Sequence, residues 1–182
     1  MWFTDHALHG DVEQQSDPTH TVSYVGVLQQ ALRDLSAWVE KGINPPPSTK
    51  YRVVDGQVEV PSTAVERRGV QPVVNVTANG DCRAEVNAGH PVTLSGIIEL
   101  PSDTGTIIAA QWDFEGIGDF SEAHDLNSSD PPGTRARVTA SHIYAKAGTY
   151  FVTLRAVSQR EGDAHTPYGR IQNLGRVRVV VK

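Results

Sequence analysis

The chain has 182 residues, 16 lysines and arginines against 21 aspartates and glutamates, and a single cysteine, Cys82. This length is enough to bury one hydrophobic core and a small appendage. The net charge of −5 leaves no excess of basic residues, which argues against a general nucleic-acid-binding function. One cysteine cannot form an internal disulfide or a cysteine-based zinc site. No apolar run approaches the ~20 residues of a membrane-spanning helix.

The first 20 residues are rich in histidine and aspartate. They contain His6, His9, His20, Asp5, Asp11 and Asp17. Zinc accepts ligands of these types, but their spacing matches no established metal motif, so we predict no metal site here. The segment also lacks the basic region and apolar stretch of a secretory signal. It is typical of the interior of a gene product, and we expect the chain to be part of a larger protein whose export signal lies upstream.

An amphipathic helix is predicted over residues 20–42. Its apolar side chains recur at steps of three and four residues and form one stripe: Val22, Val25, Leu28, Leu32, Leu35 and Val39. Ser16 or Asp17 would cap its start, with Pro18 in the first turn. Gly42 and the prolines after it would end the helix, because glycine permits a left-handed cap and proline cannot continue a helix.

Short β segments follow a proline-rich linker at residues 45–47. Two alternating runs on either side of the Asp-Gly pair at residues 55–56 predict a hairpin. A further strand is expected over residues 72–77, and the Asn-Gly-Asp sequence at 79–81 is a turn signal. We interpret residues 1–82 as an N-terminal extension made of a histidine-rich loop, a helix, the linker and these strands.

From residue 83 the sequence changes to short β runs separated by turns. Strands are predicted near residues 84–87, 91–99, 106–114, 135–144, 149–158 and 174–181. Short strands at this spacing are typical of a mainly β, immunoglobulin-like sandwich of two antiparallel sheets. Two long connections, residues 121–134 and 159–173, carry no clear pattern.

The second half contains a Trp-Asp-Phe sequence with a glycine-rich turn, then His-x-Tyr, then Gly-x-Tyr-x-Val-x-Leu. The residues are Trp112, Asp113, Phe114, Gly116, Gly118, His142, Tyr144, Gly148, Tyr150, Val152 and Leu154. Together they make residues 83–182 resemble the PKD domain, named for the polycystic kidney disease protein. The resemblance implies a module that contacts proteins or carbohydrates, or a spacer beside an extracellular enzyme. It also implies a secreted, periplasmic or cell-surface location.

Four of these residues have structural interpretations. Trp112 can fill the space between the two sheets. Tyr150, at the start of a strand, matches the position of a tyrosine corner in immunoglobulin-like sandwiches. His142 and Tyr144 share one face of a strand, where we interpret the histidine as structural rather than as a ligand.

The stretch "WDFEGIGDF" raises the alternative of a metal site. Asp113, Glu115 and Asp119 alternate with glycines much as carboxylates do in Ca²⁺ loops. However, Ile117 occupies a position where a further ligand would be needed, and Asp113 can instead accept backbone hydrogen bonds within a turn. We favour the turn and predict no cofactor, with Ca²⁺ at the three carboxylates as the alternative.

The first half contains "HALHGD" and a later phrase formed by Leu35, Trp38, Val39, Glu40, Gly42, Pro45 and Pro46. With these residues, the segment 2–52 resembles the C-terminal end of an α/β-hydrolase of the tannase and feruloyl esterase type. The resemblance makes His9 the candidate catalytic general base, with His6 second. In this hydrolase order the serine nucleophile precedes the histidine, and no G-x-S-x-G lies before His9. We therefore expect no enzymatic activity from this chain by itself.

We predict a non-catalytic binding or spacer module of an exported, hydrolase-like, bacterial protein, with an unidentified protein or polysaccharide partner. The alternative is a C-terminal part of an esterase that contributes the catalytic histidine to a nucleophile upstream. A single amphipathic helix is marginal alone, so we expect homodimerisation through residues 22–39 or docking of the stripe on the C-terminal domain. The loop "EGDAHTPYGR" contains Asp163, His165, Tyr168 and Arg170, which we interpret as a solvated loop rather than a site.

Overall fold

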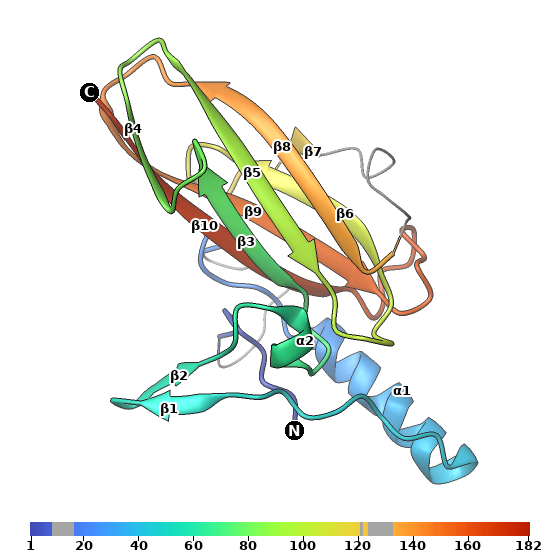
Figure 1. Ribbon diagram of the computed structural model, residues 1–182. Helices are drawn as coiled ribbons and strands as arrows, with labels where there is room; N and C mark the ends of the chain where they lie inside the picture. The colour runs from blue at the N-terminus through green and yellow to red at the C-terminus, as the bar shows by residue number, and fades with distance from the viewer. Residues whose placement is uncertain (9–16, 121, 124–132) are drawn as a thin grey trace.

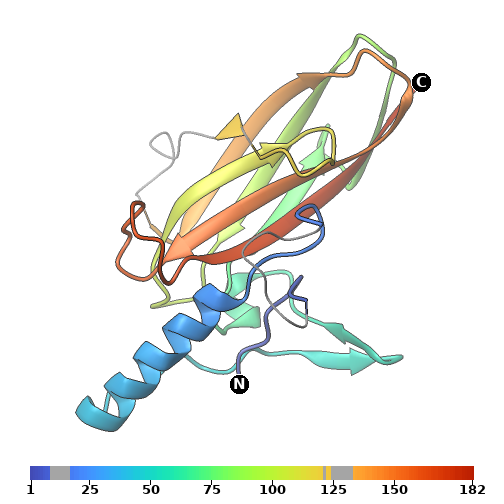
Figure 2. The same ribbon diagram turned by 180° about the vertical axis from the view of Figure 1, so that it is seen from behind.

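A β-sandwich and an N-terminal extension make up the fold (Figure 1). The computed structural model describes residues 1–8, 17–120, 122–123 and 133–182. The extension lies at one end of the sandwich together with the N-terminus, and the C-terminus lies at the opposite end (Figure 1 and Figure 2).

The strands of the sandwich form two sheets. They are β3 (Val73–Ala78), β4 (Arg83–Val86), β5 (Pro91–Glu99), β6 (Thr106–Asp113), β7 (Glu122–Ala123), β8 (Arg135–Ile143), β9 (Gly148–Gln159) and β10 (Ile171–Val181). One sheet has the order β4-β10-β9-β6-β7 and the other has the order β3-β5-β8. The predicted mainly β sandwich is confirmed, and the short strand β7 lies in a connection for which the sequence carries no clear pattern.

One strand pair departs from the predicted antiparallel arrangement. β4 runs parallel to β10, with Ala84 opposite Val179, whereas the other neighbouring strands in both sheets are antiparallel. β4 follows β3 through the predicted turn, in which Asn79 and Gly80 have φ angles of 52° and 90°. This turn moves the chain from the edge of one sheet to the edge of the other, so β4 joins β10 by a change of sheet rather than by a hairpin.

The core lies between the sheets and is made of alternate residues of facing strands. Val152 and Leu154 of β9 and Leu94 and Ile98 of β5 are all fully buried. Gly96 of β5 allows the sheets to approach closely, because a Cβ there would lie 2.2 Å from Cδ2 of Leu154. A leucine methyl group therefore packs directly on the backbone of the opposite sheet at this point.

The sandwich begins at β3, before the boundary predicted at residue 83. β3 pairs along its whole length with β5, from Val73 opposite Glu99 to Ala78 opposite Leu94. The sequence predicts this strand correctly, but its alternation pattern contains no information about which sheet it joins. Only the long-range pairing assigns it to the sandwich rather than to the extension.

The predicted helix forms as α1 (Val25–Lys41) and ends as expected. Gly42 adopts the left-handed conformation at φ 68°, and its N–H bonds to carbonyl groups of the last turn. The helix begins later than residue 20, because residues 20–22 take part in a turn and in a hydrophobic cluster. The amides of residues 20 and 21 bond to the carbonyl of Asp17 in a turn, and Val22 is buried against Phe120 and Leu174.

The predicted helix cap is wrong for Asp17, since Tyr24 occupies the cap position and α1 has no side-chain cap hydrogen bond. Ser16, the other predicted cap, lies outside the described residues.

The extension continues with the predicted hairpin and a short helix. β1 (Arg52–Val54) and β2 (Gln57–Glu59) pair antiparallel, and all six of their residues are exposed. The short helix is α2 (Ala64–Arg67), which lies where no helix is predicted. Its N-terminus has Thr63, whose hydroxyl accepts a hydrogen bond from the Glu66 amide at 3.4 Å. Thr-x-x-Glu is a capping-box pattern, so a local signal for this helix is present.

Candidate functional site

The sandwich holds α1 mainly through the first two turns of the helix. Val27 packs with Val70 and Ile171 in a small cluster at the start of β10. Gly26 is buried beside the backbone of Arg170, where a Cβ would lie 1.9 Å from the carbonyl oxygen. The helix and the chain entering β10 therefore meet with no room for a side chain between them.

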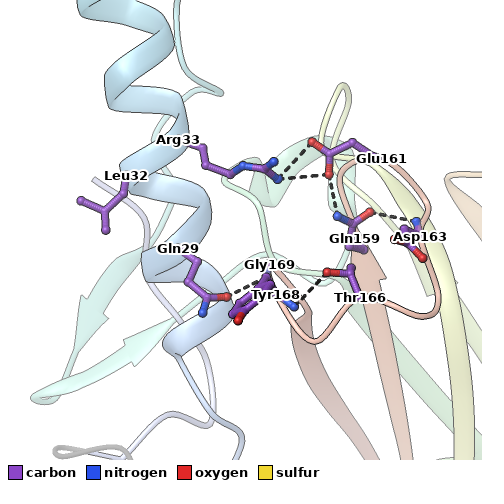
Figure 3. Close-up of a pocket in the computed structure, with 9 residues that line it drawn as sticks. All are labelled: Gln29, Leu32, Arg33, Gln159, Glu161, Asp163, Thr166, Tyr168 and Gly169. Carbon is purple, nitrogen blue, oxygen red and sulfur yellow. Dashed lines mark hydrogen bonds and ion pairs between the residues drawn. The ribbon is translucent and has the colours of Figure 1, made fainter.

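The loop between β9 and β10, residues 160–170, is bonded to the same part of α1 (Figure 3). Gly169 N–H donates to Oε1 of Gln29 at 2.7 Å, Arg160 donates to Oδ2 of Asp34 at 3.0 Å, and Arg33 pairs with Oε1 of Glu161 at 3.2 Å. The Asp34 side chain is only 12% exposed, so its ion pair is largely removed from water. The Arg33–Glu161 pair is exposed at both ends and contributes less.

A cavity of about 520 Å³ lies between α1 and this loop. It is lined by Gln29, Leu32, Arg33, Gln159, Glu161, Asp163, Thr166, Tyr168 and Gly169 (Figure 3). Of the four loop residues noted in the sequence, Asp163 and Tyr168 line the cavity. His165 is not among the lining residues, and Arg170 donates instead to the carbonyls of Ala164 and Thr166, which braces the loop.

The apolar stripe of α1 remains exposed. The exposed fractions are 51% for Leu28, 61% for Leu32, 50% for Leu35, 52% for Trp38 and 73% for Val39. Val22 of the predicted stripe is buried against Phe120 and Leu174, but the predicted docking on the C-terminal domain is wrong for the part of the stripe that lies on α1. The helix packs on the sandwich through Gly26 and Val27 instead, because small residues allow the two backbones to come close. The hairpin adds further exposed valines at residues 53, 54 and 58.

A polar cluster fastens the N-terminal segment to the sandwich. The Asp5 amide donates to Oε1 of Gln71 at 2.8 Å, and Nε2 of Gln71 donates to the Asp5 carbonyl at 3.0 Å. The buried Arg67 guanidinium lies 3.7 Å from the Asp5 carboxylate. Burial lowers the pKa of Arg67, and the nearby charge of Asp5 partly opposes this. The cluster therefore keeps a charged pair at the joint between the extension and the sandwich.

Of the two candidate catalytic histidines, only His6 lies among the described residues. His9 lies outside the described residues. His6 belongs to the joint, where its Nδ1 lies 2.9 Å from Oδ1 of the buried Asn173. Asn173 also donates to the Pro72 carbonyl at 2.7 Å. The His6 side chain thus serves as a structural contact to β10.

Asp113 organises the turn that follows the core tryptophan. Its carboxylate is buried and accepts hydrogen bonds from the amides of Gly116, Ile117 and Gly118 at 2.9, 3.3 and 2.7 Å. Glu115 lies 3.4 Å from the His142 ring instead. Among the residues that the structure describes, no group of three or more His, Cys, Asp or Glu side chains is placed to hold a metal ion. The geometry is that of a turn stabilised by an aspartate.

The predicted structural residues form one continuous row of rings. Successive centroids lie 6.0 Å apart for Trp112–Phe114, 4.6 Å for Phe114–His142, 4.5 Å for His142–Tyr144 and 4.1 Å for Tyr144–Tyr150. The Tyr144 hydroxyl donates to the Phe114 carbonyl at 2.8 Å, and burial raises the pKa of this hydroxyl well above its usual range. The Tyr150 hydroxyl donates to the Lys146 carbonyl at 3.0 Å, which is the bond that a tyrosine corner makes.

Two domains of known structure are similar to part of this chain. The PKD domain of an M14-like peptidase from Thermoplasmatales archaeon SCGC AB-540-F20 is similar, with 19% identity and a TM-score of 0.40 over 59% of this chain and 91% of that one. The CARDB domain of the PF1109 protein from Pyrococcus furiosus, in complex with di-metal ions, has 11% identity and a TM-score of 0.40 over 62% and 88%. No curated protein matches the chain.

In the described part of the chain, no helix has the length and apolar character needed to cross a membrane. The family model of the PKD domain matches residues 74–166, which is just over half of the sequence and includes the whole row of rings. The chain belongs to the PKD domain family.

Proposed function

We propose that the chain is a non-catalytic spacer module of an exported bacterial protein. We also propose that a hydrolase-type domain of that protein packs on the apolar stripe of α1. PKD domains are generally non-catalytic, and they typically occur in extracellular proteins. The observation that carries the proposal is the exposure of the stripe. Leu35, Trp38 and Val39 belong to the hydrolase-like phrase of the sequence, and all three are at least half exposed.

Covering such an exposed apolar stripe would be energetically favourable. Complete burial of a leucine or valine side chain contributes about 1.5–3 kcal/mol, so covering five half-exposed apolar side chains would contribute about 5 kcal/mol. In addition, an isolated two-stranded hairpin is marginally stable in water, and β1 and β2 are exposed along their whole length. A domain that covers both α1 and the hairpin would stabilise each of them.

The ends of the chain support a spacer role. The Met1 carbonyl accepts from the Thr49 amide at 3.0 Å, and the Phe3 amide donates to the Thr49 hydroxyl at 3.1 Å. The N-terminus is thus held beside the segment that joins α1 to the hairpin, while the C-terminus lies at the far end of the sandwich (Figure 1). A hydrolase-type domain preceding residue 1 would begin at the end of the sandwich that carries α1 and the hairpin (Figure 1).

A second copy of the chain is the other occupant to consider. A paired helix from a second copy would cover α1, whose 17 residues span about 25 Å. It would leave uncovered the exposed valines of the hairpin, which lies on the other side of the N-terminus from α1 in Figure 1. The wider apolar surface therefore fits a folded domain better than a single helix.

The test compares this chain alone with the protein expressed from its whole reading frame. We expect α1 and the hairpin to exchange amide hydrogens faster in the chain alone, which should be monomeric by light scattering. In the longer protein, Leu35→Lys should make the amides of α1 exchange faster, whereas Val65→Lys, at an 84% exposed position of α2, should leave their exchange unchanged.

Three outcomes would overturn the proposal. A reading frame that starts at Met1 would remove the hydrolase domain. A dimer of this chain that Leu35→Lys dissociates would make a second copy the occupant of the stripe. Hydrolysis of short p-nitrophenyl esters by the chain alone, lost in His9→Ala, would favour the alternative of an esterase with its own nucleophile.

A further inference from the structure

We propose that the cavity between α1 and the β9–β10 loop binds a neutral saccharide of one or two rings. Leu32 of the stripe is one of the nine lining residues and the other eight lie outside the stripe, so the cavity does not require the hydrolase-type domain. Its volume of about 520 Å³ is within the range of about 300–1,000 Å³ that small-molecule sites occupy.

The loop wall of the cavity is organised before any ligand binds. Gln159 is buried, and its side-chain amide spans the loop: Nε2 donates to Oε2 of Glu161 at 2.5 Å, and Oε1 accepts from the Asp163 amide at 3.0 Å. The Gly169 amide is fixed in turn by Gln29 of α1 at 2.7 Å. A ligand would therefore meet polar groups that are already positioned, which lowers the entropic cost of binding.

The charges of the cavity favour a neutral ligand. Glu161 is compensated by Arg33, whose Nη1 lies 3.2 and 3.3 Å from its two oxygens. This leaves Asp163 as the one carboxylate of the lining residues without a cationic partner. An anion would be repelled by Asp163. A cation would gain one exposed ion pair, which is worth at most about 1 kcal/mol.

The remaining groups suit the surface of a sugar. Asp163 accepts hydrogen bonds, the Gln29 amide nitrogen donates them, and the hydroxyls of Thr166 and Tyr168 do both. Each hydroxyl group of a sugar both donates and accepts hydrogen bonds, so a sugar needs both kinds of partner. The Tyr168 ring, 66% exposed, supplies apolar surface for the C–H face of such a ring. A purely apolar ligand would leave the polar groups of the loop without partners.

The experiment is a two-dimensional ¹⁵N NMR titration of the chain with four disaccharides: cellobiose, xylobiose, maltose and diacetylchitobiose. We expect at least one of them to shift the amides of Gly169 and Tyr168. Tyr168→Ala and Asp163→Asn should each weaken that binding at least tenfold. Phe151→Ala is the matched control, because Phe151 is also an exposed aromatic residue but does not line the cavity.

Thermal unfolding of each variant provides the folding control, and both Asp163 and Tyr168 are exposed enough for the variants to keep the wild-type transition. The sugars are added to about 20 mM, which is 20 times a dissociation constant of about 1 mM. The absence of amide shifts with all four sugars at this concentration would overturn the proposal. Binding that survives Tyr168→Ala, or that Phe151→Ala removes, would place the sugar elsewhere and would also overturn it. Shifts of the same amides by trilysine, with none by the sugars, would replace the saccharide by a cationic ligand. None of these outcomes depends on the stripe-covering domain.

Discussion

Gly26→Ala is expected to loosen α1 from the sandwich, although alanine is the better helix former. A Cβ at residue 26 would lie 1.9 Å from the carbonyl oxygen of Arg170, about 1.5 Å short of ordinary van der Waals contact, which begins near 3.4 Å. The obstacle is the backbone of the chain entering β10 rather than the end of a flexible side chain. The helix or the loop must therefore move.

Two effects of opposite sign compete in this variant. Replacing glycine by alanine inside a helix contributes about 1 kcal/mol of stability, whereas overpacking typically costs about 1–3 kcal/mol. The movement would also break the Gln29–Gly169 hydrogen bond and the Arg160–Asp34 pair, at about 1 kcal/mol each. We expect a net loss of about 2–4 kcal/mol in the free energy that holds α1 on the sandwich.

Amide hydrogen exchange of Gly169 measures this loss directly, because its N–H is the donor to Gln29. A loss of this size should accelerate its exchange about 30- to 1,000-fold, with little change at core amides such as Val152. Ser36→Ala, an exposed substitution on the same helix, raises helix propensity without touching the loop and should leave Gly169 unchanged. Unchanged exchange at Gly169 in Gly26→Ala, with a raised melting temperature, would refute the close packing.

Three further substitutions test the sandwich and its joint. Asp113→Asn removes the charge and one acceptor oxygen from the carboxylate that bonds three amides, and should cost about 1–3 kcal/mol in urea unfolding; a cost below about 0.5 kcal/mol would contradict its role in the turn. Tyr144→Phe should cost about 1 kcal/mol at neutral pH. Burial raises the Tyr144 pKa, so above about pH 10 the folded protein keeps this proton while the unfolded chain begins to release it. The stability of the wild type should therefore fall more steeply with pH in this range than the stability of Tyr144→Phe. Equal slopes of unfolding free energy against pH would reject this expectation. Asn173→Ala leaves the Pro72 carbonyl without its donor and should cost about 1–3 kcal/mol, with faster exchange in residues 1–8 as the diagnostic.

The strands could be predicted because their signals are local. In β9, Val152, Leu154 and Ala156 stand at every second position, and this period of two predicts the strand and the face that joins the core. The turn after Trp112 is equally local, since Asp113 bonds to amides only three to five residues ahead. Such patterns need no knowledge of the rest of the chain.

The cavity and the joint could not be predicted, because their partners are distant in sequence. Gln29 and Gly169 are 140 residues apart, and His6 and Asn173 are 167 residues apart. The loop "EGDAHTPYGR" has the composition of a solvated loop, and only the docking of α1 turns it into the wall of a cavity. The apolar stripe shows the same limit, because the sequence predicts the stripe but leaves open whether a second copy or the C-terminal domain covers it.

α1 has two faces with different roles, and this decides what kind of spacer the chain would be. A flexible linker leaves the domains at its two ends free to reorient. Here Gly26 and Val27 pack tightly, and Asp34 forms a largely buried ion pair, so the sandwich fixes the direction in which the helix projects. A domain packed on the opposite, apolar face would therefore be held in a fixed orientation relative to the sandwich. Gly26→Ala should therefore change the relative orientation of the two domains while leaving the stripe itself intact, which small-angle X-ray scattering of the longer protein would detect.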